Sequence, residues 1–229
     1  MQESLRTYYR DMFPTQLICN WLTLNGKYEL SSRKFAMMPH YKREKIETPE
    51  ALQEYLDEKC PITFQITPSV GNKRPLFFEV DMDDYYDTIK RTCQCKEREC
   101  CDTCWQQVAR KPLIDCLDFC CNFMEFKHVV PLFSGGRGFW IIINDPEVWL
   151  YDTESKTSFA KRVPARIDTG VTIQKNHLMK IPLTPHHRTG ILCVPILDPQ
   201  TFVPSMAPHY AEVGEEHEDL MQEWTSVLE

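Results

Sequence analysis

Short apolar stretches in the middle of the chain predict strands. Residues 62–67 alternate between apolar and polar, and 76–83 begin as an apolar run, with the turn signal Gly71-Asn72 between them. This layout predicts a β-hairpin or a neighbouring pair of strands. Two further strands are expected on either side of a glycine-rich loop, at 129–133 and 139–143. Further along the chain, the apolar segments 147–151 and 191–197 predict two additional strands. In the second segment, Pro195 favours an edge position or a bulge.

Helical spacing dominates the N-terminal region. Residues 2–24 repeat apolar side chains with the helical period and are interrupted by Pro14, which predicts two short helices meeting at a corner. Thr48 followed by Pro49 is a typical helix start, and that helix should run to about Lys59.

Two more helices are expected towards the C-terminus. The segment between Cys93 and Cys121 becomes helical after its cysteines, and Pro112 should kink or interrupt it. The acidic stretch 216–228 places Leu220, Trp224 and Leu228 on one face of an amphipathic helix.

Length and composition indicate a globular chain. Its 229 residues are 42% hydrophobic, which is enough for a core of its own. We predict one domain over residues 1–211, with a cysteine-rich knuckle inserted at about 93–105, and an acidic tail over 212–229. The net charge of −7 argues against nonspecific nucleic-acid binding by the surface as a whole. Any nucleic-acid contact should therefore be local.

No apolar run reaches the ~20 residues needed to cross a bilayer, and the first residues lack the layout of a signal peptide. We therefore expect no membrane association and a location in the cytosol or nucleus. In a reducing compartment, eleven cysteines are unlikely to form a disulfide framework, and the clustered ones point to metal.

The cysteine cluster predicts one structural zinc ion. Cys101 and Cys104 have the spacing that lets two thiolates bind one metal, and Cys93 and Cys95 can complete a tetrahedral site. Cys100 is a substitute for one of the first pair. A redox pair is the weaker alternative. We expect the remaining cysteines, Cys116, Cys120 and Cys121 among them, to be buried small hydrophobes.

Asp81 and Asp83 end the apolar run at 76–80. On a strand they would project from the same face about 7 Å apart, because the rise is ~3.3 Å per residue. Two such carboxylates can share a pair of divalent ions. The alternative is that the strand ends in a solvated acidic turn.

The loop Ser134-Gly135-Gly136-Arg137-Gly138 has the composition of a phosphate cradle. Glycine N–H groups can approach an anion, and arginine grips phosphate with a planar fork. A plain hairpin turn fits the same letters. A third element offers a lone carboxylate, Asp168, and a basic group that comprises Lys180, His186, His187 and Arg188.

In this order the motifs resemble the catalytic small subunit of archaeo-eukaryotic DNA primases. The resemblance runs from Tyr8-Tyr9-Arg10-Asp11-Met12-Phe13-Pro14 through Asp81-Met82-Asp83, the cysteine knuckle, the glycine loop and Arg166-Ile167-Asp168 to Val194-Pro195-Ile196. It implies an α/β (α+β) fold of primase type, with an RRM-like catalytic half and the inserted zinc knuckle.

The resemblance also implies roles for particular residues. Three carboxylates would bind two Mg²⁺ or Mn²⁺ ions: Asp81, Asp83 and Asp168. The triphosphate of the incoming nucleotide would be held by Arg33, Ser134, Gly135, Arg137, Lys180 and His186. Zinc would be held by Cys93, Cys95, Cys101 and Cys104.

The chain departs from the family pattern at three places. The eukaryotic loop usually has a second arginine where Gly136 stands and a histidine where Trp140 stands. Gln94 separates two zinc cysteines that are commonly adjacent. Only about thirty residues separate the glycine loop from Asp168, so the usual helical insertion is absent. The chain is thus identified as a compact, divergent member.

The resemblance implies DNA primase activity, which is template-directed synthesis of short RNA primers from NTPs on single-stranded DNA. It further implies a primase large subunit and a replicative DNA polymerase as partners, in the nucleus or at a site of viral DNA replication. Two rival functions are a primase-polymerase that extends with dNTPs and a non-catalytic subunit of the same fold.

Overall fold

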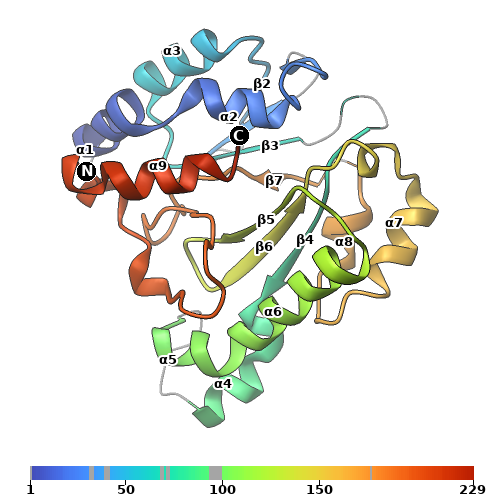
Figure 1. The fold of residues 1–229 in the computed structure, drawn as a ribbon. Coiled ribbons are helices and arrows are strands. Elements are labelled where there is room, and N and C mark those ends of the chain that lie inside the picture. The colour runs from blue at the N-terminus through green and yellow to red at the C-terminus, as the bar shows by residue number, and fades with distance from the viewer. Residues whose placement is uncertain are drawn as a thin grey trace.

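The computed structural model describes residues 2–30, 34–38, 42–67, 70, 73–92, 100–175 and 177–229. Its strands form two antiparallel sheets (Figure 1). The four-stranded sheet has the order β2 (Lys42–Glu44), β1 (Phe35–Met37), β3 (Phe64–Ile66) and β7 (Met179–Lys180). The three-stranded sheet has the order β4 (Leu76–Asp81), β6 (Gly138–Ile143) and β5 (Val129–Phe133).

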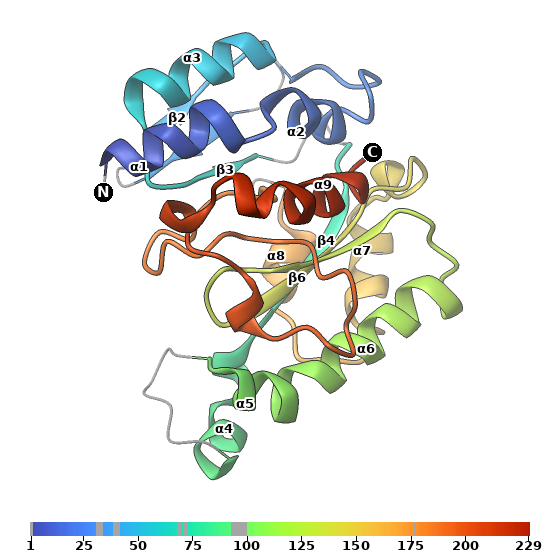
Figure 2. The same cartoon turned by 60° about the vertical axis from the view of Figure 1, so that its left-hand side comes forward.

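Helices cover the two sheets separately (Figures 1 and 2). The N-terminal helices gather by the first sheet: α1 (Gln2–Thr7), a π-helical turn (Tyr8–Met12), α2 (Thr15–Leu22) and α3 (Pro49–Lys59). Those around the second sheet are α4 (Tyr86–Thr92), α5 (Asp102–Cys104), α6 (Arg110–Asp118), α7 (Thr153–Ala160) and α8 (Thr169–Ile173). The C-terminal helix α9 (Glu218–Ser226) lies between the N-terminal helices and the second sheet.

The core follows from the apolar pattern of the central strands. Every residue of β6 is buried, and β4 and β5 flank it on its two edges. Trp105 packs edge-on against Phe133, with 5.4 Å between ring centroids, and thereby attaches the helix after the cysteine segment to β5. In α9 the side chains of Met221 and Trp224 are buried, so the tail packs onto the domain.

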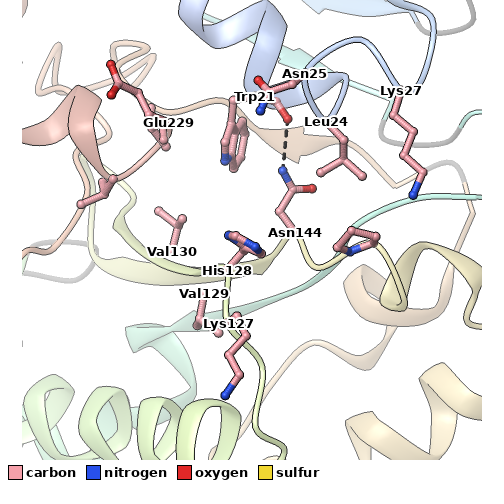
Figure 3. Close-up of a pocket in the computed structure, with 13 residues that line it drawn as sticks. Trp21, Leu24, Asn25, Lys27, Lys127, His128, Val129, Val130, Asn144 and Glu229 are labelled. Atoms are coloured by element: carbon pink, nitrogen blue, oxygen red, sulfur yellow. Dashed lines mark hydrogen bonds between the residues drawn. The ribbon is translucent and has the colours of Figure 1, made fainter.

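Asn144, just after β6, connects the two halves of the molecule. Its side-chain N–H donates to the carbonyl of Trp21 at 3.1 Å (Figure 3), and its side-chain oxygen accepts from the indole of Trp149 at 3.0 Å. Because this amide is buried and both of its groups are paired, it fixes the position of α2 against the second sheet.

Several sequence predictions are confirmed. The N-terminal helices break at Pro14, and α3 runs from Pro49 to Lys59. The hydroxyl of Thr48 accepts from the N–H of Ala51 at 3.1 Å, as an N-cap should. The mixed α+β class with antiparallel sheets is as expected.

Other predictions are wrong. β3 pairs with β1 and β7 and not with β4, so the two predicted strands do not pair with each other, although an antiparallel bridge joins Val70 and Lys73 on either side of the predicted turn. Residues 147–151 contain a 3₁₀ turn, Val148–Leu150, in place of a strand. Residues 191–197 make only isolated bridges, such as Leu132 with Pro195. In each case tertiary contacts decide between conformations that short apolar runs leave open.

Pro112 does not interrupt its helix. It lies in the first turn of α6, directly after a π-helical turn, Trp105–Ala109, where the register of backbone bonds changes and a missing N–H is tolerated. Cys121 is exposed, against expectation, whereas Cys116 and Cys120 are buried. Among the described residues no helix is long and apolar enough to span a membrane.

Candidate active site

The first carboxylates lie where β4 ends. The strand stops at Asp81, and residues Met82–Tyr85 form a 3₁₀ turn, so the predicted alternation of Asp81 and Asp83 along one strand is wrong. The turn nevertheless keeps the two acids together, because the N–H of Asp83 donates to the carboxylate of Asp81 at 2.9 Å. Both side chains remain about half exposed, at 42% and 49%.

Arg137 of the glycine loop bridges these two acids. Its Nε lies 3.5 Å from the carboxylate of Asp81, and its Nη2 donates to the carboxylate of Asp83. Its Nη1 is buried and has no hydrogen-bond partner among the described residues. The loop therefore meets the acids, and one guanidinium donor is left for a further acceptor.

Asp168 approaches the same turn from a distant part of the chain. Arg166 donates from its backbone N–H to the hydroxyl of Tyr85 at 3.0 Å and from its guanidinium to the carbonyl of Asp84 at 2.7 Å. Asp168 then caps α8, which packs on β4. The pKa of Asp84 is raised first by burial and then by the charge of Asp81, with Asp83 and Asp168 adding to it. The charges of all three predicted acids thus reach Asp84 in this turn.

Glu79 is a site residue that the sequence reasoning missed. Burial, reinforced by the charge of Asp81, raises its pKa to about 7, while Lys180 and a hydrogen bond from Trp140 lower it and Asp168 raises it. Its position two residues before Asp81, on the same face of the strand, was a signal that could have revealed it.

The glycine loop folds back on itself instead of presenting all its N–H groups outward. The Ser134 hydroxyl oxygen accepts from the N–H groups of Gly136 and Gly138, at 3.2 and 3.3 Å. Its own hydrogen stays available to donate. Gly135 has a φ of +75°, and a Cβ there would lie 2.4 Å from the carbonyl oxygen of Ile191. Only glycine lets the loop approach so closely.

Four basic side chains line the same cleft as the carboxylates and are called the basic wall: Lys180, His186, His187 and Arg188. Lys180 is 4% exposed, and burial lowers its pKa, although the charges of Cys193 and Glu79 oppose that shift. Burial, followed by the charges of Lys180, His187, Arg188 and Arg137, lowers the pKa of His186 to about 3. The imidazole is therefore neutral near pH 7.

The hydrogen bonds around His186 define its tautomer. The Thr189 hydroxyl donates its single hydrogen to the carbonyl of Gly135 at 2.6 Å, so it must accept from Nδ1 of His186, 3.2 Å away. Nδ1 then carries the proton, and Nε2 has a free lone pair beside Gly136. Protonation of Nε2 would turn it into a donor for an anion.

These elements line one cleft with a volume of about 510 Å³. Of the predicted residues, it contains Asp81, Ser134, Arg137, Lys180 and His186, and Glu79 and Trp140 also line it. Asp83 and Asp168 border this group through the contacts above. A separate hollow of about 310 Å³ beside Trp21, Lys27 and His128 contains none of the predicted site residues (Figure 3).

Two residues of the glycine-loop region that depart from the family pattern, Gly136 and Trp140, have a structural correlate. A Cβ at Gly136 would lie 3.0 Å from Nε2 of His186, so a larger residue there would require the imidazole to shift. Trp140 is 4% exposed and stacks on Phe77, with 5.8 Å between ring centroids. The glycine thus makes room for the His186 ring, and the tryptophan extends the core to the floor of the cleft.

Among the described residues, no group of three or more His, Cys, Asp or Glu side chains is already arranged around a common metal position. The donor chemistry still fits a divalent cation, because carboxylate oxygens are hard ligands. Burial, followed by the charge of Asp81, also raises the pKa of Glu79 at this end of β4.

The structure describes two of the four predicted zinc ligands, Cys101 and Cys104. Cys93 and Cys95 lie outside the described residues, as does Arg33. The Sγ atoms of Cys101 and Cys104 are 3.7 Å apart, close to the spacing of two sulfurs each about 2.3 Å from one tetrahedral zinc.

Comparisons with known proteins find similar sequences and a similar fold. A family model described as "DNA primase small subunit" matches residues 78–165, which include most of β4, the cysteine segment and the glycine loop. The DNA primase small subunit of Schizosaccharomyces pombe is 28% identical over 212 residues, covering 80% of this chain and 45% of the relative. The chain is related to the DNA primase small-subunit family.

Other relatives support the same family. The DNA primase small subunit of Saccharomyces cerevisiae is 28% identical over 161 residues, covering 60% of this chain and 38% of the relative. The chain therefore spans less than half the length of these curated primase small subunits. A solved structure, the polymerase domain from Mycobacterium tuberculosis Ligase D in complex with DNA, covers 99% of this chain and 92% of its own, with a TM-score of 0.57 and 12% identity. That likeness concerns the fold.

Proposed function

We propose that this chain carries the nucleotidyl-transfer site of a DNA primase and joins ribonucleotides into short RNA primers on a single-stranded DNA template. One observation carries the proposal: acids at the end of β4 face Arg137, Lys180 and the glycine loop across a single cleft. The acids can bind divalent cations and the basic side chains can bind a negatively charged triphosphate, so the cleft matches a nucleoside triphosphate with its divalent ions.

Asp81, Asp83 and Asp168 would hold two Mg²⁺ or Mn²⁺ ions. When bound, these ions would lower the pKa of the attacking 3′-hydroxyl and neutralise charge on the leaving pyrophosphate. Arg137 now neutralises Asp81 and Asp83, and with cations on the acids its guanidinium would be released to grip phosphate.

The residues of the chain itself would position the triphosphate. The Nη1 of Arg137 and the Ser134 hydroxyl supply donors, Lys180 supplies a buried positive charge, and His186 lines the same cleft. The 3′-oxygen attacks the α-phosphorus, the bond to pyrophosphate breaks, and the hydroxyl proton leaves to water. Positioning and charge stabilisation would supply most of the rate.

The resemblance adds elements that stay proposals. Arg33 would contact the triphosphate, and one zinc ion would organise the cysteine knuckle. A primase large subunit and a replicative polymerase would be the protein partners.

The test is a priming assay on single-stranded DNA with NTPs and Mg²⁺ or Mn²⁺. The double variant Asp81→Asn/Asp83→Asn should lose at least ~100-fold of the primer synthesis, because it removes the charges that hold the ions. Asp115→Asn/Asp118→Asn on α6 makes the same change in charge away from the cleft and should retain activity. No product from the wild-type chain, even with a large subunit added, would refute the proposal.

The chain resembles a solved polymerase domain in fold, and the match covers 99% of the chain. This likeness favours a second candidate function, a primase-polymerase that uses dNTPs. The same assay with dNTPs in place of NTPs separates the two. A non-catalytic subunit would make product with neither substrate.

A further inference from the structure

A second charged pocket lies at the opposite end of β4 from the acids. It has a volume of about 240 Å³, and its walls include Arg74, Tyr151, Asp152, Lys156 and Lys175. By chain geometry it is roughly 20 Å along the strand from Asp81. It sits where α7 and the end of α8 meet the start of β4 (Figures 1 and 2).

Arg74 brings a buried positive charge to this pocket with only neutral hydrogen-bond partners. Its side chain is 1% exposed, and it donates to the carbonyls of Gln174, at 2.9 Å, and Thr172. Its Nε is buried without a hydrogen-bond partner among the described residues. Burial lowers its pKa to about 10, so the guanidinium remains charged at neutral pH.

Lys156 of α7 adds a second buried cation. It is 6% exposed, and within the described part of the chain its Nζ makes neither a hydrogen bond nor an ion pair. Burial and then the charge of Arg74 lower its pKa to about 8, while Asp152 opposes the shift. The residue is largely buried while its Nζ still reaches solvent, so a lysine placed here without an ion pair favours an anion beside it.

The lining residues supply too little negative charge. Asp152 is the one carboxylate among them, and its Oδ1 already accepts from the N–H of Ser155 at 2.8 Å as the N-cap of α7. Lys175 contributes a third cation at the rim. Three positive side chains thus share a small pocket with one acid.

We propose that this pocket binds a phosphate group. Phosphate carries up to two charges and only acceptor oxygens, so it would complement donors that come from Lys156, Lys175 and Arg74 without needing a donor in return. The pocket holds roughly eight waters at about 30 Å³ each, which is room for a phosphate and part of its hydration. Its source is either a free phosphate or pyrophosphate ion, or a phosphate of a nucleic-acid backbone.

The binding test uses the full chain without divalent ions or nucleotides. Sodium phosphate is titrated at constant ionic strength, with chloride and acetate as comparison anions, and binding is followed by calorimetry. Wild type should show saturable phosphate binding. Lys156→Met keeps the apolar stem and should weaken binding at least tenfold, whereas Lys156→Arg should retain most of it.

Lys161→Met, an exposed lysine just after α7, is the matched control and should bind phosphate like wild type. If Lys156→Met does not fold, Lys175→Met decides, because Lys175 is exposed and its loss should also weaken binding. Equal phosphate binding by wild type and the variants, no saturable binding by wild type, or acetate binding as tight as phosphate would each overturn the proposal.

A second measurement identifies the source of the phosphate. Fluorescence anisotropy of a short single-stranded DNA should show weaker binding to Lys156→Met if the pocket takes a backbone phosphate. It should show unchanged binding if the pocket takes a free ion. Because neither arm uses the acids at the end of β4, a failed priming assay would leave this result intact.

Discussion

The two ends of β4 carry charges of opposite sign and balance them differently. At the carboxyl end, the acids Glu79, Asp81 and Asp83 face Arg137 and Lys180, so opposite charges meet within the protein. At the start of the strand, Asp152 is the one carboxylate among the described residues that line the pocket with Arg74 and Lys156. The first end is a balanced cleft that can exchange its internal partners for ions and a triphosphate. The second has an excess of cations, and only a ligand from outside can complete it.

The strongest way to break the balance at the acidic end is Arg137→Ala. This variant leaves Asp81 and Asp83 without their counter-charge and removes a phosphate donor, so primer synthesis should fall at least ~100-fold. The control is Arg162→Ala, which removes an arginine that stacks on Phe119 and Phe123 far from the cleft. Primer synthesis by Arg137→Ala within threefold of wild type would show that the guanidinium is dispensable.

A second test asks whether the acidic end depends on close backbone approach. Gly135→Ala should destabilise the protein by about 3 kcal/mol, because it combines a positive φ with a collision against the Ile191 carbonyl. Gly26 also has a positive φ, +83°, but a Cβ there meets nothing within 4 Å. Gly26→Ala should therefore cost only about 1 kcal/mol. Urea denaturation measures both, and equal costs would argue against the close approach.

The zinc content of the protein tests the predicted metal site in the cysteine knuckle, which follows the acidic end of β4 in the sequence. Elemental analysis of the purified chain should give close to one zinc per chain, and Cys101→Ser/Cys104→Ser should reduce this strongly, because thiolates hold the metal. Cys121→Ser, at an exposed cysteine, should leave the content unchanged. A metal-free wild-type chain with oxidised cysteines, isolated under reducing conditions, would contradict the prediction.

A last test is a pH dependence from the basic wall. The pKa of His186 is about 3 in the folded chain, well below its usual value, so the unfolded chain binds more protons between pH 6.5 and 3. The free energy of unfolding should therefore fall as the pH is lowered through this window, and less steeply in His186→Gln. Chemical denaturation at several pH values measures the difference. Identical slopes would mean that the folded environment does not disfavour the imidazolium.

Local patterns predicted the parts of the site that lie close together in the sequence. β5, the glycine loop and β6 follow from two apolar runs around a glycine-rich turn, and the start of α3 follows from Thr48 and Pro49. Asp81 and Asp83 were found correctly as neighbours but for the wrong reason, since a 3₁₀ turn and not a strand holds them together.

Contacts between distant segments could not be predicted in this way. The partners of β3 were assigned wrongly because an apolar alternation specifies which face is buried and not which strand lies beside it. Glu79 was overlooked because its significance comes from burial beside Asp81 and Asp168. The neutral tautomer of His186 depends on Thr189 and Gly135, which meet only in the folded chain.

The sequence by itself determined the apolar strand that ends in acids, the glycine loop, the helix caps and the resemblance to primase small subunits. These depend on side-chain type and on spacing over a few residues. The tertiary structure alone decided that Arg166 ties Asp168 to the turn after β4 and that Arg137 bridges two acids. It alone decided that Arg74 and Lys156 share a pocket. The physical reason is that electrostatic balance depends on distance and burial, and both are set by how remote segments pack.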